Sequence, residues 1–338
     1  MEFKKIIFNS KTIFTENSNP VNEEIEILYL KCYNGLINKI LNNNITLEKL
    51  IPGSPFIDGL TDYNKFHISS LLIDLGYDLD IVLNFLSINI DKSLNVLKVY
   101  DTTNMWYTSN IHMGALSIIS KSKNKNSIEL AAKMIKELDR TNFSSTKWKY
   151  KGSINRIAAF YHYVPFIDRH DIHISEETLS MLYEDLTYMQ NSLGSFTYPN
   201  GFSCIELDSV VVLAYLKKKG YDVSKMLELK LFNSQCTLKE NGWSLYSKGQ
   251  NKLRSFAELC TNISSIQDFL WNTKKIFYDV EKLQYDNGHK GLVSNSSDVT
   301  LMSNYFGLIT YIQLINSLDI DIKNDIKKIK SYSLAYVV

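Results

Sequence analysis

Residues 190–208 read QNSLGSFTYPNGFSCIELD, and this stretch decides the fold. A loop rich in Asn, Ser, Gly and Pro leads to two acids, Glu206 and Asp208, and an almost wholly apolar run follows over residues 209–214. Loops of this composition separate elements of secondary structure. The apolar run is typical of an element buried in a core. The stretch therefore predicts a turn that opens an apolar helix.

Comparable short loops recur along the chain. Residues 240–243 read ENGW and residues 284–290 read QYDNGHK. Aromatic residues stand in such loops at intervals of 42 to 50 residues, at Phe56, Trp106, Trp148, Phe196 and Trp243, with a sixth loop near Lys290. A period of this length indicates one supersecondary unit per repeat, whose apolar face is buried by its neighbours. About six helix pairs are expected, either closed into a toroid or stacked as an open array.

The remaining sequence favours an all-α chain. It has only five prolines and 14 glycines, and residues 23–42, 127–138 and 176–189 show helical periodicity. Ser175 is predicted to be an N-cap. Residues 75–79 read LGYDL, and the similar sequence GYDV occurs at 220–223. At both places we predict a glycine in the left-handed conformation at the end of one helix and an Asp that caps the next helix.

We therefore predict an α/α toroid of about six helix pairs over residues 51–338. Its inner helices should begin near residues 60, 108, 153, 206, 252 and 298. Residues 1–50 are predicted to form an N-terminal helical extension packed on the outside of the toroid.

Charge and composition exclude several classes of partner. Lys and Arg number 37 and Asp and Glu 36, so no basic surface for nucleic acid is indicated. The four cysteines are widely spaced, and no apolar run is long enough for a signal peptide or a membrane span. A soluble, cytoplasmic protein that acts on a small-molecule substrate is expected. Assembly into a homodimer is left open.

Two segments carry a resemblance to a known group. Gln190-x-x-x-Gly194-x-Phe196 and Gln284-x-x-x-Gly288 resemble the Q-x-x-x-G-x-W repeat of terpenoid cyclases and protein prenyltransferase β subunits. The segment from Gly194 to Asp208 is similar to their G-G-F … E-x-D segment. The resemblance implies an α/α toroid in which each such repeat opens a helix pair.

The catalytic motifs of those families are not retained. The D-x-D-D of class II cyclases is matched only by Ile205-Glu-Leu-Asp208, and the prenyltransferase zinc ligands are replaced by Lys252-Leu-Arg254 and residues 301–304. Class I D-D-x-x-D, lanthipeptide cyclase and thioester motifs are absent from the sequence. No metal or other cofactor is therefore predicted. His170 and His173 lie in a polar turn and are the only alternative candidates for metal ligands. The other interpretation of this turn is a solvated loop without a metal.

In a toroid the starts of the inner helices face one mouth, so polar residues near those starts are candidates for one pocket. Asp208 precedes an apolar run that would desolvate it, so it is the predicted general acid; the alternative is a structural first-turn acid. Tyr161 and His162 are the second catalytic candidates. The predicted substrate-binding residues are Trp106, His112, Arg156, Glu206, Arg254, Asp298 and Tyr305.

These candidates predict a terpenoid cyclase-like enzyme of the cyclase, isomerase or lyase type. It would act on a largely apolar small molecule in a specialised biosynthetic pathway, with a carboxylic acid as proton donor. Polysaccharide-lyase-like chemistry by Tyr161 and His162 is one alternative, in which arginines would hold an anionic group. The other is a non-catalytic toroid that binds an apolar ligand or a protein partner.

Overall fold

The computed structural model describes residues 20–40, 60–100, 105–143, 153–196, 204–237 and 301–320, and a few single positions between 256 and 273. Within these residues every regular element is a helix. The prediction of an all-α chain is confirmed for this part of the sequence.

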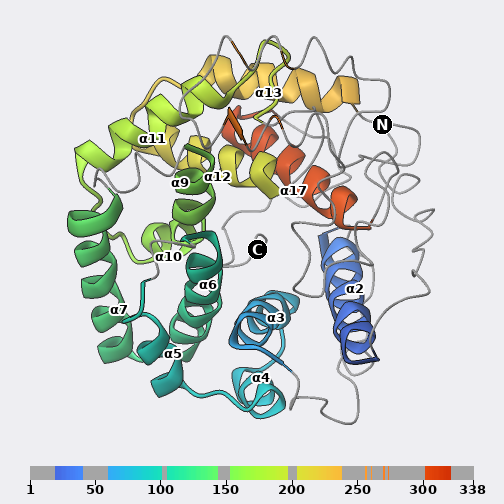
Figure 1. The fold of residues 1–338 in the computed structure, drawn as a ribbon, viewed down its shortest axis with the longest axis vertical. Helices are drawn as coiled ribbons and strands as arrows, with labels where there is room; N and C mark the ends of the chain where they lie inside the picture. The colour runs from blue at the N-terminus through green and yellow to red at the C-terminus, as the bar shows by residue number, and fades with distance from the viewer. Residues whose placement is uncertain are drawn as a thin grey trace.

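Six helices form an inner series, and Figure 1 shows them around a common centre. They are α2 (Pro20–Ile40), α3 (Asp62–Leu75), α6 (Met105–Ser122), α9 (Ser153–Tyr161), α12 (Cys204–Lys218) and α17 (Leu301–Ser317). Each contacts the next, and α17 contacts α2. We call these the inner helices.

A second set packs against the inner helices from the periphery (Figure 1). It comprises α4 (Leu79–Leu86), α5 (Ile90–Val96), α7 (Lys125–Leu138), α11 (Glu176–Met189) and α13 (Ser224–Thr237). We call these the outer helices. The short helix α10 (Val164–Arg169) follows α9, and a π-helical turn, Asp139–Phe143, ends α7.

The contacts between neighbouring inner helices show in which direction one helix runs relative to the next. Tyr29 of α2 bonds Asn64 of α3, and four residues later Tyr33 bonds His67. At the far ends of α12 and α17, the Lys217 ammonium donates to the carbonyl of Ser317. α2 therefore runs parallel to α3, and α12 runs parallel to α17.

The predicted helix boundaries agree with the structure where it describes them. Ser175 caps α11 by accepting from the amide of Thr178. Gly76 and Gly220 have left-handed φ angles of 107° and 96°. Asp78 then caps α4. A residue without Cβ ends a helix in this conformation at no steric cost, which explains the repeated Gly-Tyr-Asp.

Contrary to the expectation from sequence, the N-terminal helix α2 does not pack on the outside of the other helices. α2 lies between α3 and α17 and contacts both (Figure 1). Tyr29, Cys32 and Tyr33 on it are fully buried. α12 also contacts α17 directly, and α17 contacts α2. The inner helix expected near residue 252 falls outside the described residues.

Candidate functional site

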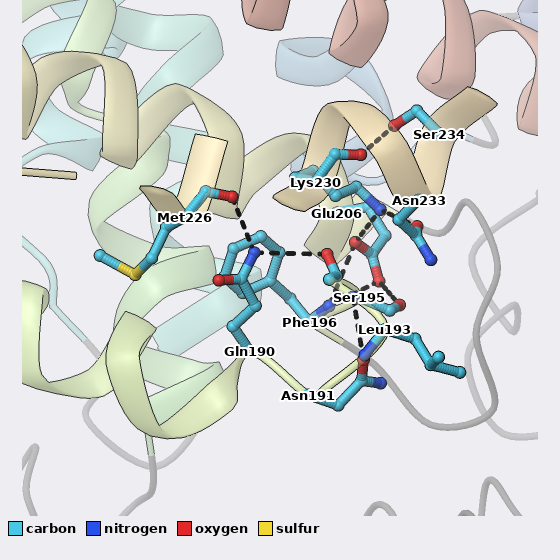
Figure 2. A network of polar contacts seen from close by, with 11 residues as sticks. Gln190, Asn191, Leu193, Ser195, Phe196, Glu206, Met226, Lys230, Asn233 and Ser234 are labelled. Carbon is cyan, nitrogen blue, oxygen red and sulfur yellow. Dashed lines mark hydrogen bonds and ion pairs between the residues drawn. The ribbon is translucent and has the colours of Figure 1, made fainter. Parts of the chain in front are cut away.

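The predicted repeat loop is a tight turn fastened to the next two helices (Figure 2). Asn191 Oδ1 accepts from the amides of Leu193 and Ser195, both at 3.0 Å. Gln190 Nε2 donates to the carbonyl of Met226 at 2.9 Å. Gly194 has φ 84°, and a Cβ there would lie 2.4 Å from the carbonyl oxygen of Leu229. Only glycine fits at that position.

Glu206 joins this turn to α12 and α13. Its carboxylate accepts from Ser195 Oγ at 2.6 Å and from the amide of Phe196 at 3.0 Å. It also pairs with Lys230 of α13, whose Nζ lies 2.5 Å from Oε2, and both side chains are fully buried (Figure 2). Burial lowers the pKa of Lys230, and the Glu206 charge opposes that shift.

These contacts give Glu206 and the motif residues Gln190, Gly194 and Phe196 a structural role. A buried ion pair is retained only when its remaining hydrogen-bonding capacity is satisfied, and here Asn233 accepts a further bond from Lys230 at 3.0 Å. The geometry provides no reason to assign Glu206 a contact with substrate.

Asp208 is buried on α12 like Glu206, but it differs from Glu206 in its direction and its partners. Two residues on a helix differ by about 200° in direction, so Asp208 faces away from α13 when Glu206 faces toward it. The carboxyl is buried, and its Oδ2 has no hydrogen-bond partner in the protein. Burial raises the pKa of Asp208 well above its ordinary value of 3.8, and its own backbone amide only partly opposes the shift. Burial therefore favours the protonated form of this carboxyl, which is the form that a proton donor needs.

His162, the second catalytic candidate, is held by α6. Its Nδ1 lies 2.9 Å from Ser109 Oγ, and both side chains are buried. Burial lowers the pKa of His162 to about 3, with a smaller contribution from nearby His112. The ring of Tyr161 lies 5.0 Å from the His162 ring, centroid to centroid. A histidine with this pKa is neutral near pH 7 and is a weak base.

His112 fastens the end of the α5 segment to α6. Its Nε2 lies 3.0 Å from the carbonyl of Val96 and 2.9 Å from that of Val99, so Nε2 carries the proton. Tyr163 then donates its hydroxyl proton to Nδ1 at 2.7 Å. Burial lowers the pKa of His112 to about 4, although the two carbonyl contacts oppose this.

Arg156 pairs with a residue that the sequence analysis did not single out. Its guanidinium forms a bidentate ion pair with Asp185 of α11, with Nη2 2.6 Å from Oδ1, and both residues are buried. The pair joins an inner helix to an outer one. The positive charge of Arg156 is thereby neutralised inside the protein, which leaves it poorly suited to hold an anionic ligand.

Tyr305 lies where α17, α2 and α3 meet. Its ring is 4.8 Å from that of Tyr33, centroid to centroid, and Tyr33 in turn contacts His67. Burial raises the pKa of Tyr305 well above its ordinary value. Arg254 and Asp298 fall outside the described residues, and so does the side chain of Trp106. The prediction that one pocket gathers these residues therefore stays a prediction.

Buried polar atoms without a partner in the protein gather on the inner helices. They include Asn110 Oδ1 and Ser117 Oγ on α6, Arg156 Nη1 on α9, Asp208 Oδ2, Ser209 Oγ and Tyr215 OH on α12, and Thr310 Oγ1 on α17. Ser117 was not a candidate from sequence. Its spacing of seven residues from Asn110, two helical turns, is the signal that would have found it.

Metal and membrane features are lacking in the described part of the chain. No group of three or more His, Cys, Asp or Glu side chains there is arranged to hold a metal ion. His170, in the alternative metal turn, has its Nε2 3.1 Å from Ser120 Oγ. None of the described helices combines the length and the apolar character needed to cross a bilayer.

No protein-family model, curated protein or solved structure matches this chain. The functional argument therefore depends on the geometry of the inner helices.

Proposed function

We propose that this chain is an enzyme of the cyclase or isomerase type, built as an α/α toroid, with Asp208 as its general acid. The two parallel pairs of inner helices and the cyclic order of the contacts support the toroid. The observation that carries the function is the buried Asp208 carboxyl on the side of α12 that faces away from α13: its Oδ2 has no hydrogen-bond partner, and burial raises its pKa.

The chemistry requires no co-reactant. Asp208 Oδ2 would give its proton to an alkene carbon or a carbonyl oxygen of the substrate, and a cationic intermediate would form. The Asp208 carboxylate would then take back a proton from another atom of that intermediate, which restores the carboxylic acid and yields an isomer of the substrate. General acid catalysis of this kind contributes about 10²–10⁴-fold to rate.

Lyase-like chemistry by Tyr161 and His162 is less well supported. A proton-abstracting base needs a pKa near the working pH, and burial holds the pKa of His162 far below it, at about 3. The Arg156 charge, which would bind an acidic sugar, is already paired with Asp185. A ligand-binding toroid without catalysis is the outcome that the following experiment separates from an enzyme.

The test is incubation of the protein with a small-molecule cell extract in D₂O, followed by mass spectrometry. An acid-catalysed isomerase should produce an isomer of one extract component that carries solvent deuterium. The Asp208→Asn variant should form it at least about 100-fold more slowly while staying folded. An unchanged rate in this variant would contradict the assignment of Asp208. If the wild-type protein depletes a component by binding it without forming a product, a non-catalytic toroid is indicated.

A further inference from the structure

A surface groove lies between the outer helix α13 and the end of the inner helix α17, which pack against each other (Figure 1). Its volume is about 320 Å³. The groove is lined by Glu228, Leu231, Phe232 and Gln235 of α13 and by Leu318 and Ile320, which follow α17. The four α13 residues are spaced as i, i+3, i+4 and i+7, so they form one stripe along the helix. An elongated element could therefore lie along this stripe.

Two large apolar side chains of the groove face water. Phe232 is 62% exposed and Ile320 is 42% exposed. Single exposed apolar side chains are common on protein surfaces, but two in one concave surface are typical of an interaction site. The groove therefore has the character of a docking surface for another apolar face.

The chain leaves α17 at this groove. The amide of Ile320 donates to the carbonyl of Ile315 at 3.0 Å, and the amide of Asp319 donates to that of Asn316 at 3.4 Å. Asp319 has a left-handed φ of 54°. These bonds and this conformation form a Schellman motif, which ends a helix and turns the chain. Because Ile320 itself lines the groove, the chain continues from the groove wall.

The sequence after this point has one apolar face. Residues 321–330, which lie outside the described residues, read DIKNDIKKIK. Their isoleucines, Ile322, Ile326 and Ile329, recur at i, i+4 and i+7. This spacing predicts an amphipathic helix with one apolar stripe.

The length and the reach of this stripe match the groove. Seven residues of helix span about 10 Å, which applies both to Ile322–Ile329 and to the α13 stripe from Glu228 to Gln235. Two residues of extended chain reach at most about 7 Å, so the first isoleucine of the segment begins close to Ile320. The segment therefore requires no long linker to lie in the groove.

The charges of the segment and the groove are complementary. Residues 321–330 contain four lysines and two aspartates, which gives a net charge of +2. Glu228 contributes an exposed carboxylate to the groove lining. Exposed ion pairs add little affinity, so the charge favours the orientation of the segment and the apolar contact would supply most of the binding.

We propose that residues 322–329 of this chain dock in the groove as an amphipathic helix, with their isoleucines packed on Phe232 and Ile320. The occupant is a segment of the same chain, and docking would hold α13 against α17. This inference is independent of the acid role of Asp208, because it concerns the outer surface of the molecule.

The test is hydrogen–deuterium exchange of the full chain, measured by mass spectrometry on peptides that cover residues 321–330. A synthetic peptide of the same sequence is the unprotected reference. The amides should exchange at least about tenfold more slowly in the protein than in the peptide, because a docked helix exchanges only when it opens. Phe232→Ser should remove most of this protection. The matched control is Tyr188→Ser on the outer helix α11, where the ring is 57% exposed, and it should leave the protection unchanged.

A double-mutant cycle tests whether the two apolar faces meet. Ile326→Ser should also remove protection, and the variant that combines it with Phe232→Ser should lose no more than either single variant, because both changes remove the same contact. Exchange in the wild type as fast as in the free peptide, or protection that is kept in Phe232→Ser, would overturn the proposal. Protection that rises with protein concentration, together with a dimer in sedimentation, would assign the groove to a second copy and would also overturn it.

Discussion

Replacement of Asp208 by Asn tests the protonation state of this carboxyl through its effect on stability. The folded state raises the pKa of Asp208, while the unfolded chain restores its ordinary value of 3.8. A group whose pKa is raised by folding stabilises the protein less as pH rises above the unfolded value. A carboxyl that stays protonated at pH 7 in the folded state would therefore cost it about 4 kcal/mol, at about 1.4 kcal/mol per pH unit.

The amide in Asp208→Asn removes that cost but buries an extra N–H, which costs about 1–3 kcal/mol if it finds no partner. This second contribution does not depend on pH. The free energy of unfolding of the variant, relative to the wild type, should therefore rise by about 1.4 kcal/mol per unit from pH 5 toward pH 7, whatever its absolute sign. Urea unfolding followed by circular dichroism at intervals of half a pH unit measures it.

Glu206→Gln is the matched control, since it makes the same chemical change two residues earlier on the same helix. It breaks the buried pair with Lys230 and should destabilise the protein by about 3–5 kcal/mol at neutral pH. A difference between Asp208→Asn and the wild type that stays flat from pH 5 to pH 8 would refute the reasoning. It would mean that Asp208 is ionised in the folded protein.

Three further perturbations follow from the structure. Gly114→Ala should destabilise by about 1–3 kcal/mol or more by thermal unfolding, because its Cβ would lie 2.0 Å from the carbonyl oxygen of Phe66. Acid should destabilise the protein from about pH 6.5 downward, because the pKa of His112 is about 4 in the folded state and 6.5 in the unfolded state. About 3 kcal/mol of the free energy of unfolding should be lost by pH 4. The free energy of unfolding of a His112→Gln variant, measured over the same pH range, should lack this His112-dependent loss. Removing Asp185 alone, as Asn, should cost about 3–5 kcal/mol in denaturant unfolding, and removing Arg156 as well should recover much of that loss; additive losses would contradict a coupled pair.

Local signals in the sequence predicted much of the fold. Inner helices expected near residues 60, 108, 153, 206 and 298 begin at Asp62, Met105, Ser153, Cys204 and Leu301. Caps and left-handed glycines are fixed within a few residues of chain, so Ser175, Gly76 and Gly220 could be recognised. The position of α2 could not, because its apolar face packs equally well on several surfaces by pattern alone.

The candidate site was predictable only in part, for a similar reason. Asp208 stood out because an apolar run follows it in sequence. The partners of Arg156 and Glu206 are Asp185 and Lys230, which lie 29 and 24 residues away on outer helices. Ion pairs over such distances are set by tertiary packing, and no local pattern reveals which charge is neutralised. The ion pair between Arg156 and Asp185 is therefore a feature that the sequence position of Arg156 does not reveal.

The most direct test of the central claim is an infrared difference spectrum between the wild type and Asp208→Asn at pH 7. A protonated carboxyl has a C=O stretching band that is distinct from the two bands of a carboxylate. We expect the wild type to show the protonated carboxyl band and the variant to lack it, because burial keeps the proton on Asp208. Loss of carboxylate bands in the variant, with no protonated band in the wild type, would contradict the claim that Asp208 is held ready to donate a proton.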